Sequence, residues 1–95
     1  MTYVLLQHRV ESYEEFRDIY DSDMPHRRRR GCKGARLFRA VDDPSLMVML
    51  MKWEDVESAR RFADGYELHE AMKWASVVGD QWRIDVLEEI EETES

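Results

Sequence analysis

The sequence predicts one α+β domain with the element order β-α-β-β-α-β, the ferredoxin-like pattern that forms a four-stranded antiparallel sheet. Four segments are rich in apolar and β-branched residues, and two longer stretches between them repeat apolar residues every three or four positions. A chain of 95 residues, 43% of them hydrophobic, is long enough for one such domain and too short for two. In this topology the first and third strands are central, and the second and fourth lie at the edges.

The first strand is expected over residues 2–10, TYVLLQHRV, because this run is rich in apolar and β-branched side chains. A helix should follow at once, since Ser12 and Glu15 have the spacing of a capping box. Large side chains that recur at three- and four-residue steps define one face of this helix. They are Tyr13, Phe16, Tyr20 and Met24.

The end of this helix is set by a proline, four arginines and a glycine. Pro25 is expected to kink or restart the helix, because proline lacks the amide proton and crowds the preceding turn. Asp23 could cap the restarted segment. Gly31 is a natural residue to end a helix, which puts residues 27–30, RRRR, in the last turn near the negative end of the helix.

A second strand is expected over residues 34–41, a turn at 42–45 and a third strand over 46–53. The third strand is apolar on both faces, with one set of side chains on each: Leu46, Val48 and Leu50, and Met47, Met49, Met51 and Trp53. Such a strand must be covered on both sides, yet the helices can cover only one. We therefore infer a homodimer in which two sheets pack face to face, with the methionines in the core or in the dimer interface.

The second helical region begins at Asp55, which is expected to cap a helix over residues 56–65. A second helical piece is expected over 66–77 and should end at Gly79. Residues 80–90 form the fourth strand and complete the element order.

The net charge of −7 is concentrated in the last eight residues, EEIEETES, which hold five glutamates. Without them, 14 basic residues stand against 16 acidic ones, so the rest of the chain is nearly neutral. We expect a single domain over residues 1–87 and a solvated acidic tail over 88–95.

Composition also bears on location. No run of about 18 apolar residues is present, so no membrane partner is expected. The chain starts directly with a strand-like run and no basic segment, which argues against a signal peptide. The single Cys32 cannot form an internal disulfide and fits a reducing compartment, so a cytoplasmic protein is expected.

The arginine run at 27–30 has three readings. A nucleic-acid site needs a basic surface that neutralises several phosphates. This cluster is short, the domain is nearly neutral, and no aromatic residues interrupt the run, so no nucleic-acid partner is expected. A structural or solvated role is favoured. The third reading is an anion or substrate carboxylate at a pocket rim, bound by Arg27 or Arg28.

Candidate chemistry rests on three histidines on three different elements. His8 shares a strand face with Val4 and Leu6 and could be a general base, since histidine titrates near pH ~6.5; the alternative is a strand-end histidine bound to a neighbouring carbonyl. His69 could border a pocket or lie half exposed, and His26 could face a pocket or support the helix end. The histidine spacings and the lone cysteine fit no metal motif, so no metal is expected.

Four segments resemble the small dimeric α+β barrel proteins of the antibiotic-biosynthesis-monooxygenase type, and together they span nearly the whole chain: VLLQHRVESYEEF, GARLFRAVDDP, MKWEDVESARRFA and HEAMKWASVVG. The resemblance implies a pocket between the sheet and the helices of each subunit. Family members of known chemistry oxidise phenolic polycyclic substrates with molecular oxygen and need no metal or flavin, so no cofactor is implied. The implied pocket residues here are Trp53, Phe62, His69, Met72 and His26, with Trp74 as further aromatic material and His8 as the candidate base.

A related branch of the superfamily degrades haem with an asparagine on the first strand and a tryptophan and a histidine on the second helix. An ungapped comparison places His8, Phe62 and Met72 at those positions. The axial histidine would be absent, so haem degradation is not expected. The same comparison suggests that His8 points into the pocket rather than towards the dimer partner.

The expected function is that of a cofactor-independent monooxygenase, or a related enzyme, acting on a small hydrophobic or aromatic molecule. The alternative is a dimer that binds a small ligand without catalysis or has a structural role. A polar group retained in an apolar pocket would favour the enzyme. A pocket filled by Phe62, Met72 and the methionines would favour the alternative.

Overall fold

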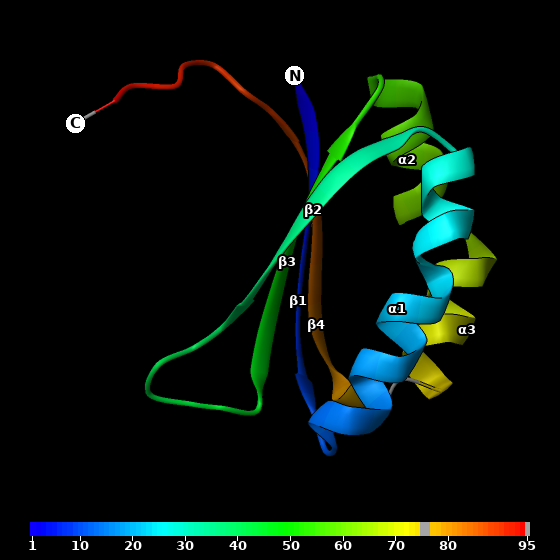
Figure 1. The fold of residues 1–95 in the computed structure, drawn as a ribbon, viewed down its shortest axis with the longest axis vertical. Coiled ribbons are helices and arrows are strands. Elements are labelled where there is room, and N and C mark those ends of the chain that lie inside the picture. Colours follow the sequence, from blue (N-terminus) through cyan, green and yellow to red (C-terminus); the bar gives the residue numbers. More distant parts are fainter. Residues whose placement is uncertain (75–76, 95) are drawn as a thin grey trace.

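The computed structural model describes residues 1–74 and 77–94, apart from the side chains of Tyr66, Lys73, Trp74, Asp80 and Gln81. Four strands form one antiparallel sheet in the order β2-β3-β1-β4. The strands are β1 (Thr2–Val10), β2 (Cys32–Arg39), β3 (Leu46–Trp53) and β4 (Val77–Glu88). The helices are α1 (Tyr13–Arg29), α2 (Val56–Ala63) and α3 (Tyr66–Trp74). All three cover the same face of the sheet (Figure 1), so the predicted ferredoxin-like α+β fold is confirmed.

The two central strands separate their side chains cleanly between the two faces of the sheet. On the helix-covered face, β1 buries Val4, Leu6, His8 and Val10, and β3 buries Met47, Met49, Met51 and Trp53. The methionines therefore belong to the core, and the dimer-interface alternative does not apply to them. The two strands are held in register by β1–β3 pairing, in which Leu6 lies opposite Met49.

The first helix begins where the sequence predicted, because the Ser12 hydroxyl accepts a hydrogen bond from the Glu15 amide at 3.2 Å. The predicted restart at Pro25 is wrong, since α1 runs through this residue as one helix, whereas the alternative of a kink stays a prediction. A proline removes one helix hydrogen bond, here the one to the carbonyl of Asp21. Asp21 and Pro25 are both exposed, so water can bind that carbonyl.

Buried contacts on both sides of Pro25 hold α1 together. Phe16 and Tyr20 are buried before the proline, and Arg27 is buried after it. Asp23 does not cap a new segment, because its carboxylate accepts a hydrogen bond from Arg27 at 3.0 Å. The helix ends as predicted at Gly31, whose φ of 113° is one that residues with a side chain rarely adopt.

The second helical region divides into α2 and α3, as the sequence indicated. Asp55 caps α2 by accepting a hydrogen bond from the Ser58 amide at 2.7 Å. Gly65 lies at the break, where a Cβ atom would approach the Arg61 carbonyl oxygen to 2.8 Å.

Gly79 does not end a helix, which corrects the sequence-based prediction. It lies within β4, which begins at Val77, and has a φ of 71°. In the β1–β4 pairing Gln7 lies opposite Arg83 but Arg9 opposite Val78, so β4 contains extra residues at this point. Gly79 is one of them, and glycine adopts the left-handed backbone that such bulges often need.

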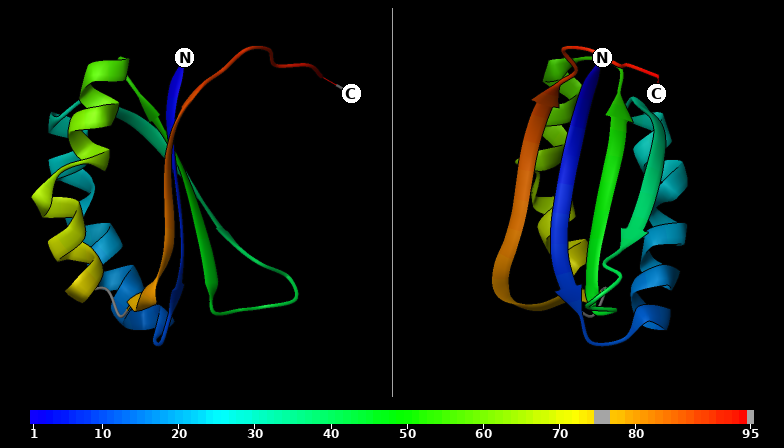
Figure 2. Two further views of the ribbon diagram at one scale, coloured as in Figure 1. Left: turned by 180° about the vertical axis from the view of Figure 1, so that it is seen from behind. Right: turned by 90° about the vertical axis from the view of Figure 1, so that its left-hand side faces the viewer.

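Within residues 1–74 and 77–94, no helix covers the second face of the sheet (Figure 2). Aliphatic side chains of β3 lie on it half-buried, and it also carries Phe38, which is 48% exposed, and Leu87, which is 40% exposed. We call this surface the open face. In the described residues, none of the helices has the length and hydropathy needed to cross a membrane.

Candidate functional site

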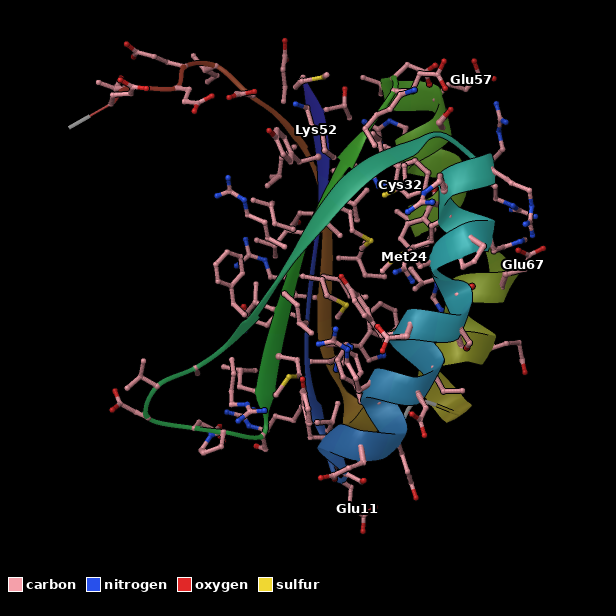
Figure 3. All side chains as sticks on the ribbon, in the orientation of Figure 1. Glu11, Met24, Cys32, Lys52, Glu57 and Glu67 are labelled. Atoms are coloured by element: carbon pink, nitrogen blue, oxygen red, sulfur yellow. The ribbon has the colours of Figure 1, made fainter. Side chains whose placement is uncertain are left out.

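A cavity of about 40 Å³ lies between the sheet and the helices, with room for only a few water-sized groups. We call it the His8 cavity. Its walls come from β1, β3 and all three helices and are mainly apolar, including Phe16, Met49, Met51, Phe62, Leu68 and Met72. Side chains from both layers, with sulfur atoms among them, fill the space between the sheet and α1 (Figure 3). Four residues with polar groups also border the cavity: His8, Tyr20, Asp23 and Arg27.

His8 lies on the central strand β1 and is only 2% exposed. Its ring meets the ring of Phe16 edge-on, with the centroids 5.4 Å apart. Burial lowers the pKa of His8 from 6.5 to about 4, so the imidazole is neutral at pH 7. Among the described residues, its Nδ1 atom has no hydrogen-bond partner. A buried polar atom without a partner is costly, so this nitrogen is well suited to bind a polar group on a ligand.

Arg27 is the one buried member of the arginine run, with 5% exposure. It donates to Asp23 at 3.0 Å and to the Tyr20 carbonyl at 3.1 Å, and its guanidinium lies 4.6 Å from the centroid of the Tyr20 ring. These contacts occupy the guanidinium, so Arg27 has a structural role and is not open to a substrate carboxylate. Arg28 is exposed, and its guanidinium donates to the Met24 sulfur at 3.9 Å.

The sequence analysis did not predict the burial of Arg27, although the helical spacing of the residues around it indicates this burial. Arg27 lies four residues after Asp23 and seven after Tyr20, so it falls on the same helix face as Phe16 and Tyr20. The run of four identical residues hid this periodicity.

His26 lies outside the His8 cavity, in contrast to the pocket position expected for it. It forms a hydrogen bond with the carboxylate of Glu67 on α3, and Arg30 donates to the same carboxylate at 2.8 Å. These contacts connect the C-terminal end of α1 to Glu67 on α3 (Figure 3). They also lower the pKa of Glu67, chiefly through the hydrogen bond from His26.

Two other expected pocket residues also lie outside the described lining. Trp53 is fully buried, and its ring centroid is 4.8 Å from that of Phe62. It therefore packs against Phe62, which itself lines the cavity. His69 meets the ring of Trp82 edge-on at 5.1 Å and is half-buried. Of the predicted pocket residues, Phe62 and Met72 line the cavity. The side chain of Trp74 lies outside the described residues.

Within the described ranges 1–74 and 77–94, no group of three or more histidine, cysteine, aspartate or glutamate residues could hold a metal ion. The polar groups at the His8 cavity are instead a neutral imidazole, a tyrosine and an arginine that is paired with Asp23. This set can orient a ligand by hydrogen bonding and can accept or donate a proton at His8.

The family model of the antibiotic biosynthesis monooxygenases matches residues 2–74 of the chain. The protein therefore belongs to the antibiotic biosynthesis monooxygenase family. No curated protein matches the chain significantly.

Solved structures support the same fold. A Bordetella bronchiseptica protein provisionally described as an antibiotic biosynthesis monooxygenase is 18% identical with a TM-score of 0.76, over 95% of this chain and 97% of that one. SnoaB of Streptomyces nogalater, described as a cofactor-independent oxygenase, is 14% identical with a TM-score of 0.74, over 99% and 96% of the two chains. A conserved Methanosarcina mazei protein is 19% identical with a TM-score of 0.71, over 90% and 89%. At these identities the likeness is one of fold.

Proposed function

We propose that this protein is a cofactor-independent oxygenase, or a related enzyme, that acts on a small hydrophobic or aromatic molecule in the His8 cavity. The observation that carries the proposal is His8 itself, a buried neutral imidazole whose Nδ1 has no partner among the described residues and which borders an apolar cavity. Family membership and the description of SnoaB support the same reaction class.

In such a reaction the substrate supplies the electrons. Loss of a proton from an activated CH₂ group gives an anion that oxygen can oxidise, and CH₂ plus O₂ yield C=O plus water overall. His8 would accept the first proton or hold a substrate hydroxyl by a hydrogen bond. With a pKa of about 4, His8 is a weak base, and an anion forming beside it raises its proton affinity. The apolar walls exclude water from the reacting group.

The size of the cavity limits the substrate. About 40 Å³ does not hold a ring system unless side chains move. Met49, Met51 and Met72 are flexible lining residues that can adopt other rotamers around a flat ligand. We therefore expect one- and two-ring phenols or naphthols, whose keto tautomers contain an activated CH₂ group, to be better ligands than larger polycycles.

Oxygen uptake with a series of phenols, naphthols and anthrones tests the proposal. Substitution His8→Gln should lower the turnover rate by about 10²- to 10⁴-fold, the usual effect of losing an acid–base group. His69→Gln is the matched control, because His69 is half-buried and lies outside the described cavity lining. Turnover that survives His8→Gln would contradict the role of His8.

The second candidate is a dimer that binds a small ligand without catalysis. It is favoured by the same small volume, since the lining residues Phe62, Met72, Met49 and Met51 leave a cavity of only about 40 Å³. Calorimetry separates the two candidates. Aromatic ligands that bind in a His8-dependent way without oxygen uptake would identify a binding protein.

We further propose that the protein is a homodimer in which the open faces of two sheets pack together. The helices cover one face only, and the open face carries half-exposed Phe38 and Leu87 beside Val48 and Leu50. A hollow on this face has both basic and acidic residues around it, including Arg36 and Glu88, so two copies can pair opposite charges.

A further inference from the structure

The arginine run is only partly explained by the burial of Arg27. Arg29 and Arg30 are exposed, and together with residues of α2 they surround a hollow of about 400 Å³ on the surface. We call this the arginine hollow. Its described lining is Arg29, Arg30, Ser58, Arg61 and Phe62. In Figure 3, nitrogen-tipped side chains gather on the outer side of the helices, between the labelled Glu57 and Glu67.

The three guanidinium groups of the arginine hollow are only weakly neutralised. Arg29 has no ion-pair or side-chain hydrogen-bond partner in the part of the chain that the structure describes. Arg61 pairs with Glu57 at 2.8 Å, but their side chains are 66% and 83% exposed, so water screens this contact. Arg30 shares the carboxylate of Glu67 with His26. An incoming anion can therefore bind Arg29 directly and compete for the other two.

The chemistry of the arginine hollow fits a phosphate group better than a carboxylate. A guanidinium presents two parallel N–H donors to one oxyanion, and arginine is preferred where such paired contacts recognise phosphate. Arg29 and Arg30 line the arginine hollow from the C-terminal end of α1, and Arg61 lines it from α2. A tetrahedral phosphate has acceptor oxygens in three directions and up to two negative charges, whereas a carboxylate is planar and carries one.

The apolar wall of the arginine hollow indicates what the phosphate is attached to. Phe62 lines the arginine hollow and also lines the His8 cavity, so it separates the two. Trp53 supports its ring from behind, with the centroids 4.8 Å apart. A group joined to a phosphate bound at Arg29 and Arg61 would meet this aromatic ring.

We propose that Arg29, Arg30 and Arg61 bind the phosphate group of a small phosphate ester whose apolar or aromatic part packs against Phe62. The site lies in the helix layer, on the side of the molecule away from the open face (Figure 1). It does not depend on the oxygenase proposal, because neither His8 nor oxygen takes part in binding.

Isothermal titration calorimetry at fixed ionic strength tests this inference, with phenyl phosphate, inorganic phosphate and benzoate as probes. Phenyl phosphate should bind once per chain and more tightly than either of the others. Arg29→Gln and Arg61→Gln should each weaken it by about tenfold or more, as expected for the loss of one charge-assisted contact. The control Arg60→Gln, an exposed neighbour on α2 outside the described lining, should leave the affinity unchanged.

Four results would overturn the inference. Unchanged affinity for phenyl phosphate in Arg29→Gln and Arg61→Gln would show that these arginines do not form the site. An equal loss of affinity in Arg60→Gln would show that binding depends only on the overall positive charge of this surface. Benzoate binding as tight as that of phenyl phosphate would exclude phosphate recognition. Tighter binding of a mixed-sequence DNA oligonucleotide, lost in the same variants, would identify a nucleic-acid surface instead. The variants change exposed side chains, and circular dichroism melting curves verify that they fold.

Discussion

At the scale of single residues, His8 couples the candidate site to the stability of the fold. It is buried beside Phe16 on the central strand, in surroundings that disfavour a charged ring. The unfolded chain carries no such penalty, so a proton binds His8 more tightly in the unfolded state than in the folded one. His8, the candidate base of the cavity, thus also makes the stability of the fold sensitive to acid.

Acidification should destabilise the protein through His8. The pKa is about 4 in the folded state and 6.5 when the ring is solvated, so stability is full above pH ~6.5 and falls as the pH drops towards ~4. The loss at pH ~4 should be on the order of 3 kcal/mol. Denaturant unfolding across this range measures it. His8→Gln is the comparison, since it keeps the carboxylates that also titrate in acid and removes only the histidine. Parallel pH profiles for the two proteins would contradict the burial of a neutral His8.

At the scale of elements, α1 shows how buried side chains override a local signal. Proline is the poorest helix former, and sequence reasoning therefore expected a kink or restart at Pro25. Buried Phe16 and Tyr20 before it, and buried Arg27 after it, keep the segment helical. The missing hydrogen bond to the Asp21 carbonyl therefore still lowers the stability of the helix.

Replacement of that proline should therefore stabilise the protein. Pro25→Ala restores the amide donor for the Asp21 carbonyl and should raise the free energy of unfolding by about 2 kcal/mol, somewhat less than the intrinsic difference of ~3 kcal/mol because proline also restricts the unfolded chain. Urea denaturation measures the change. Ser22→Ala, an exposed substitution on the same helix, should stay within about 0.5 kcal/mol. A loss of stability in Pro25→Ala would speak against a continuous α1.

The sequence could predict features that depend on neighbouring residues, but not those that depend on contacts between distant segments. Strand alternation was enough to predict the bounds of β3 and the side chains that share a face of β1 with His8, because side-chain direction in a strand depends only on neighbouring positions. That this face of β1 lies towards the helices was implied only by the family resemblance. Gly79 was assigned to a helix end because left-handed glycines occur both there and in β-bulges, and only the pairing with β1 decides between them. The positions of His26, His69 and Trp53 depend on how helices pack on the sheet, which no local pattern contains. The division into a domain over 1–87 and a tail over 88–95 stays a prediction.

At the scale of the whole molecule, the main feature is a sheet covered on one face. The radius of gyration, 13.2 Å, is that of a small compact chain, yet apolar side chains of the central strand β3 remain half-buried on the open face. In the homodimer proposed above, a second copy of the chain would provide the matching surface, since a two-fold axis brings identical faces together. The cavity and the arginine hollow lie on the helix side and stay accessible in this arrangement.

Sedimentation equilibrium at micromolar concentration should give about twice the chain mass of 11.4 kDa. Val48→Lys places a charge in the middle of the open face and should shift the mass towards the monomer, because an unpaired charge is costly in an apolar interface. Val56→Lys makes the same chemical change on exposed α2 and should remain dimeric. A monomeric wild-type protein, or equal behaviour of the two variants, would remove the sheet-to-sheet dimer.

The methionines that line the His8 cavity have a consequence for the lifetime of the proposed enzyme. Reaction of an anion with oxygen passes through peroxide-level species, and peroxides convert thioethers to sulfoxides. Met49, Met51 and Met72 are the thioethers beside the reacting position. A polar sulfoxide in this apolar space would close the site to its substrate, so each catalytic cycle carries some risk of self-inactivation. Mass spectrometry of protein recovered after many turnovers would detect this damage as added oxygen on the three lining methionines, with exposed Met24 as the internal reference for oxidation from solution.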